Sequence, residues 1–255
     1  MKRKISMLAA SAAAVLCLTG CFSEENDNPS HVMDIGSYRQ GVFTSDGGYR
    51  YRVTENNVGD RLSDKDRVIL YFDVLEETEA GRQYDIRVTE LIDVTCKNAV
   101  KSNEEDIDPE TGEPLGEDAI ILSSGWFSGG YLNIEAAVFR KKSGSTLRQV
   151  NLEYRGVQND TVRLAMRHNA FGETPVGEDG TIREDNGFEI ATSFYSVPSD
   201  WMLPSGTDSF PVSIESTWYV ADELGKVSFK KIYTKGSIIR SGTGSPSMTI
   251  GVIGQ

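Results

Sequence analysis

Apolar and polar residues alternate with a period of two along most of the chain, and helical periodicity is nearly absent. The longest regular run extends from Tyr84 to Val94, where only Glu90 interrupts the apolar row. Its apolar members are Tyr84, Ile86, Val88, Ile92 and Val94. A strand with one apolar and one charged face covers a core on one side and contacts solvent on the other. The alternation therefore predicts an all-β fold.

The alternating runs form two series, separated by the segment from Lys101 to Asp118. The first series includes Val68, Leu70, Phe72 and Val74, which share one face of a predicted strand. The separating segment is rich in Asp, Glu, Pro and Gly, a composition typical of a loop or an interdomain connection. The second series resumes near Tyr131 and continues to Tyr233 without intervening helices. We therefore expect two antiparallel β domains, the second a sandwich or barrel.

The acidic segment also partly matches a calcium-binding loop. Asp106, Asp108, Glu110 and Glu117 occupy the first, third, fifth and twelfth places of an EF-hand type loop. The match fails at Thr111, which stands where that loop needs its glycine, and no flanking helices are predicted. A solvated connection is the preferred interpretation, and no metal site is expected.

The N-terminus has the pattern of an export signal. Residues 2–4 are basic, and the apolar run from Ile5 to Leu18 is too short to remain as a membrane-spanning helix. The tetrapeptide Leu18-Thr19-Gly20-Cys21 resembles the lipobox of bacterial lipoproteins. It predicts a signal peptide over residues 1–20 and acylation, for example by palmitate, of Cys21. An ordinary secretory signal with a chance cysteine is the alternative.

The residues after Cys21 are polar and acidic, and they predict a tether over residues 21–35. The stretch resembles the export signal that follows the cysteine in surface lipoproteins of the Bacteroidetes. A plain solvated linker is the other interpretation. We therefore expect a lipid-anchored protein of the outer membrane that faces either the periplasm or the cell exterior.

Charge and cysteine content limit the partners and the cross-links. The chain has 38 Asp+Glu and 26 Lys+Arg, and the signal removes three of the basic residues, so the mature charge is 38 − 23 = 15 negative units. This charge argues against nucleic acid as a partner. Cys17 leaves with the signal and Cys21 is lipidated, so Cys96 stands alone and an intrachain disulfide is not expected. Its strand pattern predicts that Cys96 is a small buried side chain.

Catalytic constellations are scarce in the sequence. The two histidines are His31, in the predicted tether, and His168, which is expected on the surface beside Arg167. No G-x-S-x-G elbow occurs, and the ligands for a zinc site are too few. Carboxylates are abundant, so an Asp/Glu pair acting on glycans remains the alternative function. The preferred expectation is a protein without enzymatic activity or a cofactor.

Four strand segments together resemble the NigD-like lipoproteins of the Bacteroidetes. They are Asp66–Phe72, Tyr84–Val94, Gly130–Ile134 and Val150–Tyr154. The resemblance implies an N-terminal OB-type barrel, over residues 36–118, and a C-terminal β-sandwich, over residues 119–255. The founding member of the family is linked to a bacteriocin locus and has been proposed as an immunity factor. No catalytic residues transfer from the family.

The expected role is binding or protection in the cell envelope, as an immunity-like or accessory protein. Candidate partners are the lipid membrane, a toxin or another envelope protein, and a polysaccharide. Trp126 and Trp201 are interpreted either as sugar-stacking residues in loops or as caps of the sandwich core, the second being preferred. A structural envelope protein is a further alternative.

The tripeptide Asp160-Thr161-Val162 resembles the O-glycosylation motif of Bacteroidetes envelope proteins. It makes Thr161 a candidate modification site, although three residues often match by chance.

Overall fold

The computed structural model describes residues 31–102, 104–142, 149–183, 187–198, 209–240 and 246–251. The predicted signal peptide, Cys21 and Trp201 lie outside these residues. Within them the regular structure consists of β-strands and one short 3-10 turn, Gly59–Arg61. The predicted all-β class is confirmed.

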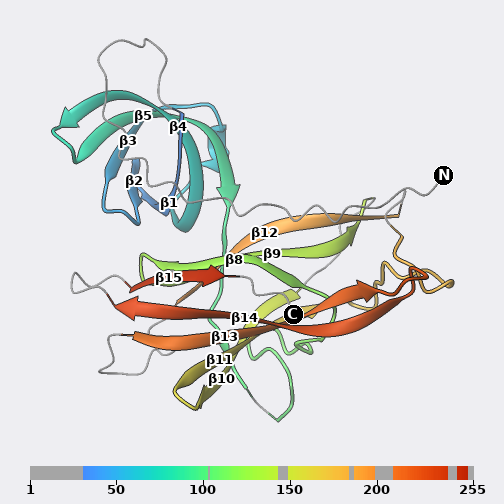
Figure 1. Cartoon of the computed structure of the whole chain (residues 1–255). Coiled ribbons are helices and arrows are strands. Elements are labelled where there is room, and N and C mark those ends of the chain that lie inside the picture. The colour runs from blue at the N-terminus through green and yellow to red at the C-terminus, as the bar shows by residue number, and fades with distance from the viewer. Residues whose placement is uncertain are drawn as a thin grey trace.

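The N-terminal part is a closed five-stranded barrel with the strand order β1-β2-β3-β5-β4 (Figure 1). Its strands are β1 (His31–Arg39), β2 (Val42–Ser45), β3 (Arg50–Asn56), β4 (Lys65–Glu79) and β5 (Gln83–Asp93). The pairing of β3 with β5 is parallel, and the other pairs are antiparallel. The core is formed by inward-facing side chains such as Phe43, Phe72 and Ile86, which are fully buried.

A β-bulge explains why Glu90 interrupts the apolar row of β5. Tyr71 pairs with Glu90 while Phe72 pairs with Val88, so Thr89 is the extra residue in this strand. A bulge of one residue reverses which side chains face the core. Leu91 therefore joins the barrel core after the bulge, and the prediction that Ile92 shares the inner face of Val88 is wrong.

The C-terminal part is a sandwich of two sheets. One has the order β15-β14-β13-β11-β10-β7, and the other β6-β12-β9-β8. The strands are β6 (Thr95–Cys96), β7 (Val100–Lys101), β8 (Ile121–Ser128), β9 (Tyr131–Lys141), β10 (Gln149–Gln158), β11 (Thr161–Asn169), β12 (Phe188–Pro198), β13 (Ser209–Ala221), β14 (Val227–Arg240) and β15 (Pro246–Gly251). Leu132, Ile134, Leu164 and Ile214 are fully buried between the sheets.

The change from barrel to sandwich falls near residue 94, earlier than the division expected at residue 118. β6 pairs with β12 of one sheet and β7 pairs with β10 of the other, so residues 95–101 close one side of the sandwich. Each strand is only two residues long, and strands that short show no alternation in the sequence. The first barrel strand also begins at His31, inside the segment that was expected to be a tether.

The acidic segment is part of the sandwich and is not a solvated connection between domains. Asp108 and Leu115 are buried, and the backbone of Asp118 hydrogen-bonds to that of His168 in β11. The segment lies against β10 and β11, on the side opposite to the inter-sheet core. Its charges therefore meet partners on the sheet, which composition alone does not reveal.

Among the described residues, no helix is long and apolar enough to cross a membrane.

Candidate functional site

A buried polar network joins the barrel to the sandwich. Arg67, on β4, binds both carboxylate oxygens of Asp46 at 2.6 and 2.7 Å and donates to the amide oxygen of Asn133 at 2.8 Å. The hydroxyl of Ser196, on β12, donates to the same amide oxygen at 2.6 Å. Ser128 completes the network with a hydrogen bond to Asp46. The polar side chains of two barrel residues and three sandwich residues thus provide hydrogen-bond partners for one another.

The local backbone is shaped to fit this junction network, which we define as Asp46, Arg67, Ser128, Asn133 and Ser196. Asp46 lies in the turn between β2 and β3, which the Asp-Gly-Gly sequence favours. The guanidinium of Arg67 also lies 4.7 Å from the ring centre of Tyr131, within the range of a cation–π contact. Because bidentate and stacked contacts fix the guanidinium in one orientation, the network holds the two domains in one relative position.

A second network crosses the outer face of the six-stranded sheet. Its members alternate in charge, and each lies within 3.2 Å of the next: Asp106, Arg167, Glu153, Arg155, Glu215 and Lys231. Arg167 also donates to the carbonyl of Gly116 at 2.8 Å. This charge ladder therefore fastens the acidic segment onto the sheet.

Two acids of the ladder, Glu153 and Glu215, have lowered pKa values. Burial alone would raise the pKa of Glu153, but hydrogen bonds from Ser102 and Arg155 outweigh burial and lower it. The pKa of Glu215 is lowered in the same way, burial being outweighed by Lys231 and Arg155. A general acid must keep its proton near the working pH. Neither carboxyl group meets that requirement, and the arrangement fits a structural role.

A cluster of tyrosines lies in the barrel wall. The ring centres of Tyr51 and Tyr84 are 5.8 Å apart, and Tyr49 lies 6.4 Å from Tyr84 with 45% of its surface exposed.

Burial raises the pKa of Asp34, against opposing hydrogen bonds from the Ile35 amide and the Ser45 side chain. A carboxyl group with a raised pKa is a candidate for function. Tyr49 lies in the turn before β3, and Tyr51, Tyr84 and Asp34 lie on the barrel strands.

Exposed aromatic rings lie on β14 of the six-stranded sheet. Phe229 is 60% exposed and Tyr233 is 46% exposed, and both lie on β14 with Lys231 between them. The ring of Phe229 contacts that of Tyr219 on the paired strand, with 5.1 Å between their centres. This group of side chains, Tyr219, Phe229, Lys231 and Tyr233, is called the β14 face below.

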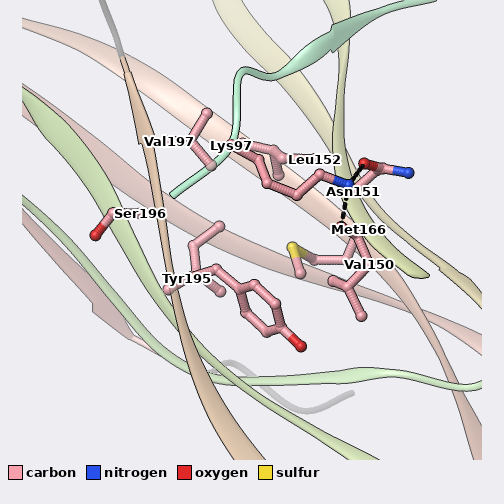
Figure 2. Close-up of a pocket in the computed structure, with 9 residues that line it drawn as sticks. Lys97, Val150, Asn151, Leu152, Met166, Tyr195, Ser196 and Val197 are labelled. Carbon is pink, nitrogen blue, oxygen red and sulfur yellow. Dashed lines mark hydrogen bonds between the residues drawn. The ribbon is translucent and has the colours of Figure 1, made fainter. Parts of the chain in front are cut away.

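A small pocket opens where the linker between the domains crosses the edge of the sandwich (Figure 2). Lys97 lines it beside β10, together with side chains from both sheets: Leu152 and Met166 from one, and Ile134, Tyr195 and Val197 from the other. Its free volume is about 10 Å³, room for about one water molecule. The pocket is too small for an organic substrate.

Two residues lie elsewhere than their sequence patterns predict. His168 was expected on the surface, but it is 2% exposed and its Nδ1 lies 2.9 Å from the carbonyl of Ala119. Its side chain points to the same inner side of β11 as those of Val162, Leu164 and Met166. Cys96 was expected to be buried, but it is exposed, because β6 is an edge strand.

Three further residues, His31, Trp126 and Thr161, lie in β-strands. His31 pairs with Asp73 at 3.1 Å on the barrel surface. Trp126 is half-buried on β8. Thr161 begins β11 after the tight turn at Asn159 and Asp160, and its hydroxyl hydrogen-bonds to the carbonyl of Asn159 at 3.3 Å.

Two of the four carboxylates that suggested a calcium loop, Asp106 and Asp108, bind protein partners. Asp106 binds Arg167 at 2.6 Å, and Asp108 accepts from Gln149 at 2.6 Å and lies 3.4 Å from the amine of Lys97. In the described part of the chain, no three residues among His, Cys, Asp and Glu are grouped so that they could hold a metal ion.

Comparison with known proteins identifies the sandwich. Residues 103–181 match the model of the NigD-like C-terminal beta sandwich domain. No protein among those with curated descriptions matches the chain.

Three solved structures have the same fold. A NigD-like immunity protein from Bacteroides caccae is 18% identical with a TM-score of 0.54, covering 80% of this chain and 94% of that one. A protein of unknown function from Bacteroides vulgatus is 16% identical with a TM-score of 0.53, covering 89% and 92%. A candidate lipoprotein from Bacteroides fragilis is 11% identical with a TM-score of 0.51, covering 80% and 97%.

At these identities the structural likeness concerns the fold. Together with the family match, it confirms the resemblance that the sequence segments predict. The chain carries a NigD-like C-terminal β-sandwich domain, and a small closed barrel precedes it.

Proposed function

We propose that this protein is a lipid-anchored envelope protein that acts by binding a macromolecule and not by catalysis. The observation that carries the proposal is the junction network, which makes the barrel and the sandwich one body starting at His31. Residues 22–30 can span roughly 35 Å at most, because an extended chain covers about 3.3–3.6 Å per residue. Acylated Cys21 would therefore keep this body close to the membrane.

The neighbours support an envelope location and a protective role. The B. caccae protein is named an immunity protein and the B. fragilis protein a candidate lipoprotein. An immunity-like role requires a surface that captures a toxin or another envelope protein. The β14 face offers exposed rings beside a lysine, the mixture that binding surfaces favour. The closed barrel of five strands supports assignment to the OB type.

Replacing Cys21 with serine should release the protein from membranes. Serine cannot form the thioether that carries the lipid, and the acyl chains contribute about 0.8 kcal/mol for each buried methylene. We expect the wild-type protein to partition into detergent after cell fractionation, and the variant to lose its lipid and that partitioning. The control is Cys96→Ser, which should leave partitioning unchanged. A Cys21→Ser protein that keeps its acyl chains would contradict the proposal.

The alternative is an enzyme that acts on glycans through an Asp/Glu pair. The ionised, ion-paired state of Glu153 and Glu215 speaks against it, whereas Asp34 is the carboxyl group whose raised pKa would suit a general acid. We expect that pure protein releases no reducing sugar from envelope polysaccharides. Release that disappears in Asp34→Asn but persists in the exposed-site control Asp60→Asn would establish the enzyme.

A further inference from the structure

The amine of Lys97 is held against a side-chain amide in a mostly apolar setting. Its Nζ lies 2.5 Å from Oδ1 of Asn151 and 3.3 Å from the backbone carbonyl of Val150. Figure 2 shows the amide oxygen of Asn151 turned toward this amine and the amide nitrogen on the far side. Asn151 is 2% exposed, and its Nδ2 has no hydrogen-bond partner among the described residues.

An acid completes the cluster. Oδ2 of Asp108 lies 3.4 Å from Nζ of Lys97, and Asp108 is 1% exposed. Gln149 and the backbone amide of Glu110 hold its two carboxylate oxygens, at 2.6 and 2.9 Å. A lysine, an asparagine amide and a fixed carboxylate therefore meet at one point, although the three residues come from the linker, β10 and the acidic segment.

We propose that Lys97 and Asn151 form an intramolecular isopeptide bond, with Asp108 as the base. Asp108 takes one proton from the Lys97 ammonium, and the resulting amine attacks Cγ of Asn151. A second Nζ proton passes to Nδ2 as the Nζ–Cγ bond forms and the Cγ–Nδ2 bond breaks. Nδ2 leaves as ammonia, which takes up the proton from Asp108 and departs as ammonium. No oxidant or cofactor takes part, and the carboxylate is regenerated.

The surroundings favour this reaction over simple hydrogen bonding. An amine is a good nucleophile only without its extra proton. Apolar surroundings disfavour the charged ammonium, and an adjacent general base can take up its proton as the reaction begins. Burial would raise the pKa of Asp108, but Glu110, Gln149 and Lys97 lower it, so the carboxylate is charged and can accept a proton. The fold holds the two reacting groups in contact, so the reaction is intramolecular. Each group therefore meets the other at a large effective concentration.

The isopeptide bond would provide a covalent cross-link, which the cysteines of this chain cannot form. Cys96 is the one cysteine after Cys21, so a disulfide within the mature body is excluded. The bond would join the linker after β6, on the four-stranded sheet, to β10 of the six-stranded sheet. A cross-link of this kind limits the freedom of the unfolded chain and keeps the two sheets together outside the cell.

The test is a tryptic digest of the folded, full-length protein, purified in detergent and then denatured. Trypsin cannot cut after an acylated lysine, so we expect one linked species that joins residues 88–101 to residues 149–155. Its mass should equal the sum of the two peptides less one ammonia. The intact wild-type protein should weigh one ammonia less than its sequence predicts, whereas Lys97→Met should match the mass of its own sequence.

Three variants locate the chemistry, and circular dichroism checks that each one folds. Lys97→Met, Asn151→Ala and Asp108→Ala should all lack the linked species. Asp106→Asn is the matched control, because Asp106 lies in the same segment but binds Arg167, and it should keep the link.

Two results would overturn the proposal, whatever the variants do. The first is wild-type protein that yields separate peptides 88–97 and 149–155 and no mass deficit. The second is a link between Lys97 and Asp108 that is accompanied by loss of water, because that would show that Asn151 is not the acceptor. An Asp108→Ala protein that still cross-links would contradict the role of Asp108 as the base.

Discussion

Arg67→Ala is expected to lower the free energy of unfolding by about 3–5 kcal/mol, the cost of breaking a buried ion pair by removing one partner. The side chains of Arg67 and Asp46 are 2% and 10% exposed, so alanine would leave the Asp46 carboxylate buried without its cation. Asn133 and Ser196 would lose a donor at the same time. Denaturation with urea, monitored by fluorescence, measures the change.

The matched control is Arg39→Ala. Arg39 pairs with Asp66 on the same barrel, but the two side chains are 52% and 65% exposed. Exposed pairs contribute roughly 0–1 kcal/mol, so this variant should remain close to wild type. If the two alanine variants lose similar amounts of stability, the junction network does not hold the domains together. A variant that unfolds in two separate transitions would show in addition that Arg67 couples them.

Gly116→Ala is expected to destabilise the protein by roughly 2–4 kcal/mol, combining left-handed strain with overpacking. Gly116 has φ +75°, and a Cβ there would lie 2.4 Å from the carbonyl oxygen of His168 and 2.7 Å from Cα of Asn169. Both contacts are backbone, so neither can move aside without displacing β11. Thermal unfolding of the two proteins measures the difference.

Gly112→Ala isolates the steric part of this effect. Gly112 lies in the same segment with φ +74°, and a Cβ there would meet nothing within 4 Å. It should therefore cost only the conformational strain of the left-handed backbone, roughly 1–2 kcal/mol. Equal losses from Gly112→Ala and Gly116→Ala would mean that the acidic segment does not pack against the sheet.

The strands could be predicted because alternation is a local property. Val68, Leu70 and Phe72 share the barrel core as their spacing predicts, and Val150 and Leu152 face the sandwich core. The bulge in β5 could not be predicted, because its register depends on pairing with β4. Glu90 was the only local signal that the alternation changes there.

The polar networks could not be predicted, because their members are far apart in the sequence. Arg67 and Asn133 are separated by 66 residues, and Arg167 and Asp106 by 61. The acidic segment looks like solvent-exposed chain by composition, yet Asp108 finds Gln149 and Lys97 on elements that only the fold brings together. His168 was misplaced for a different reason: its alternating register pointed inward, but its polarity suggested the surface.

The lipid anchor is tested most directly by the mass of the N-terminal peptide of the mature protein, purified from membranes of its native host. The proposal predicts a peptide that begins at Cys21 and carries acyl chains on that residue. A mature N-terminus elsewhere, or a Cys21 with an unmodified thiol, would contradict it.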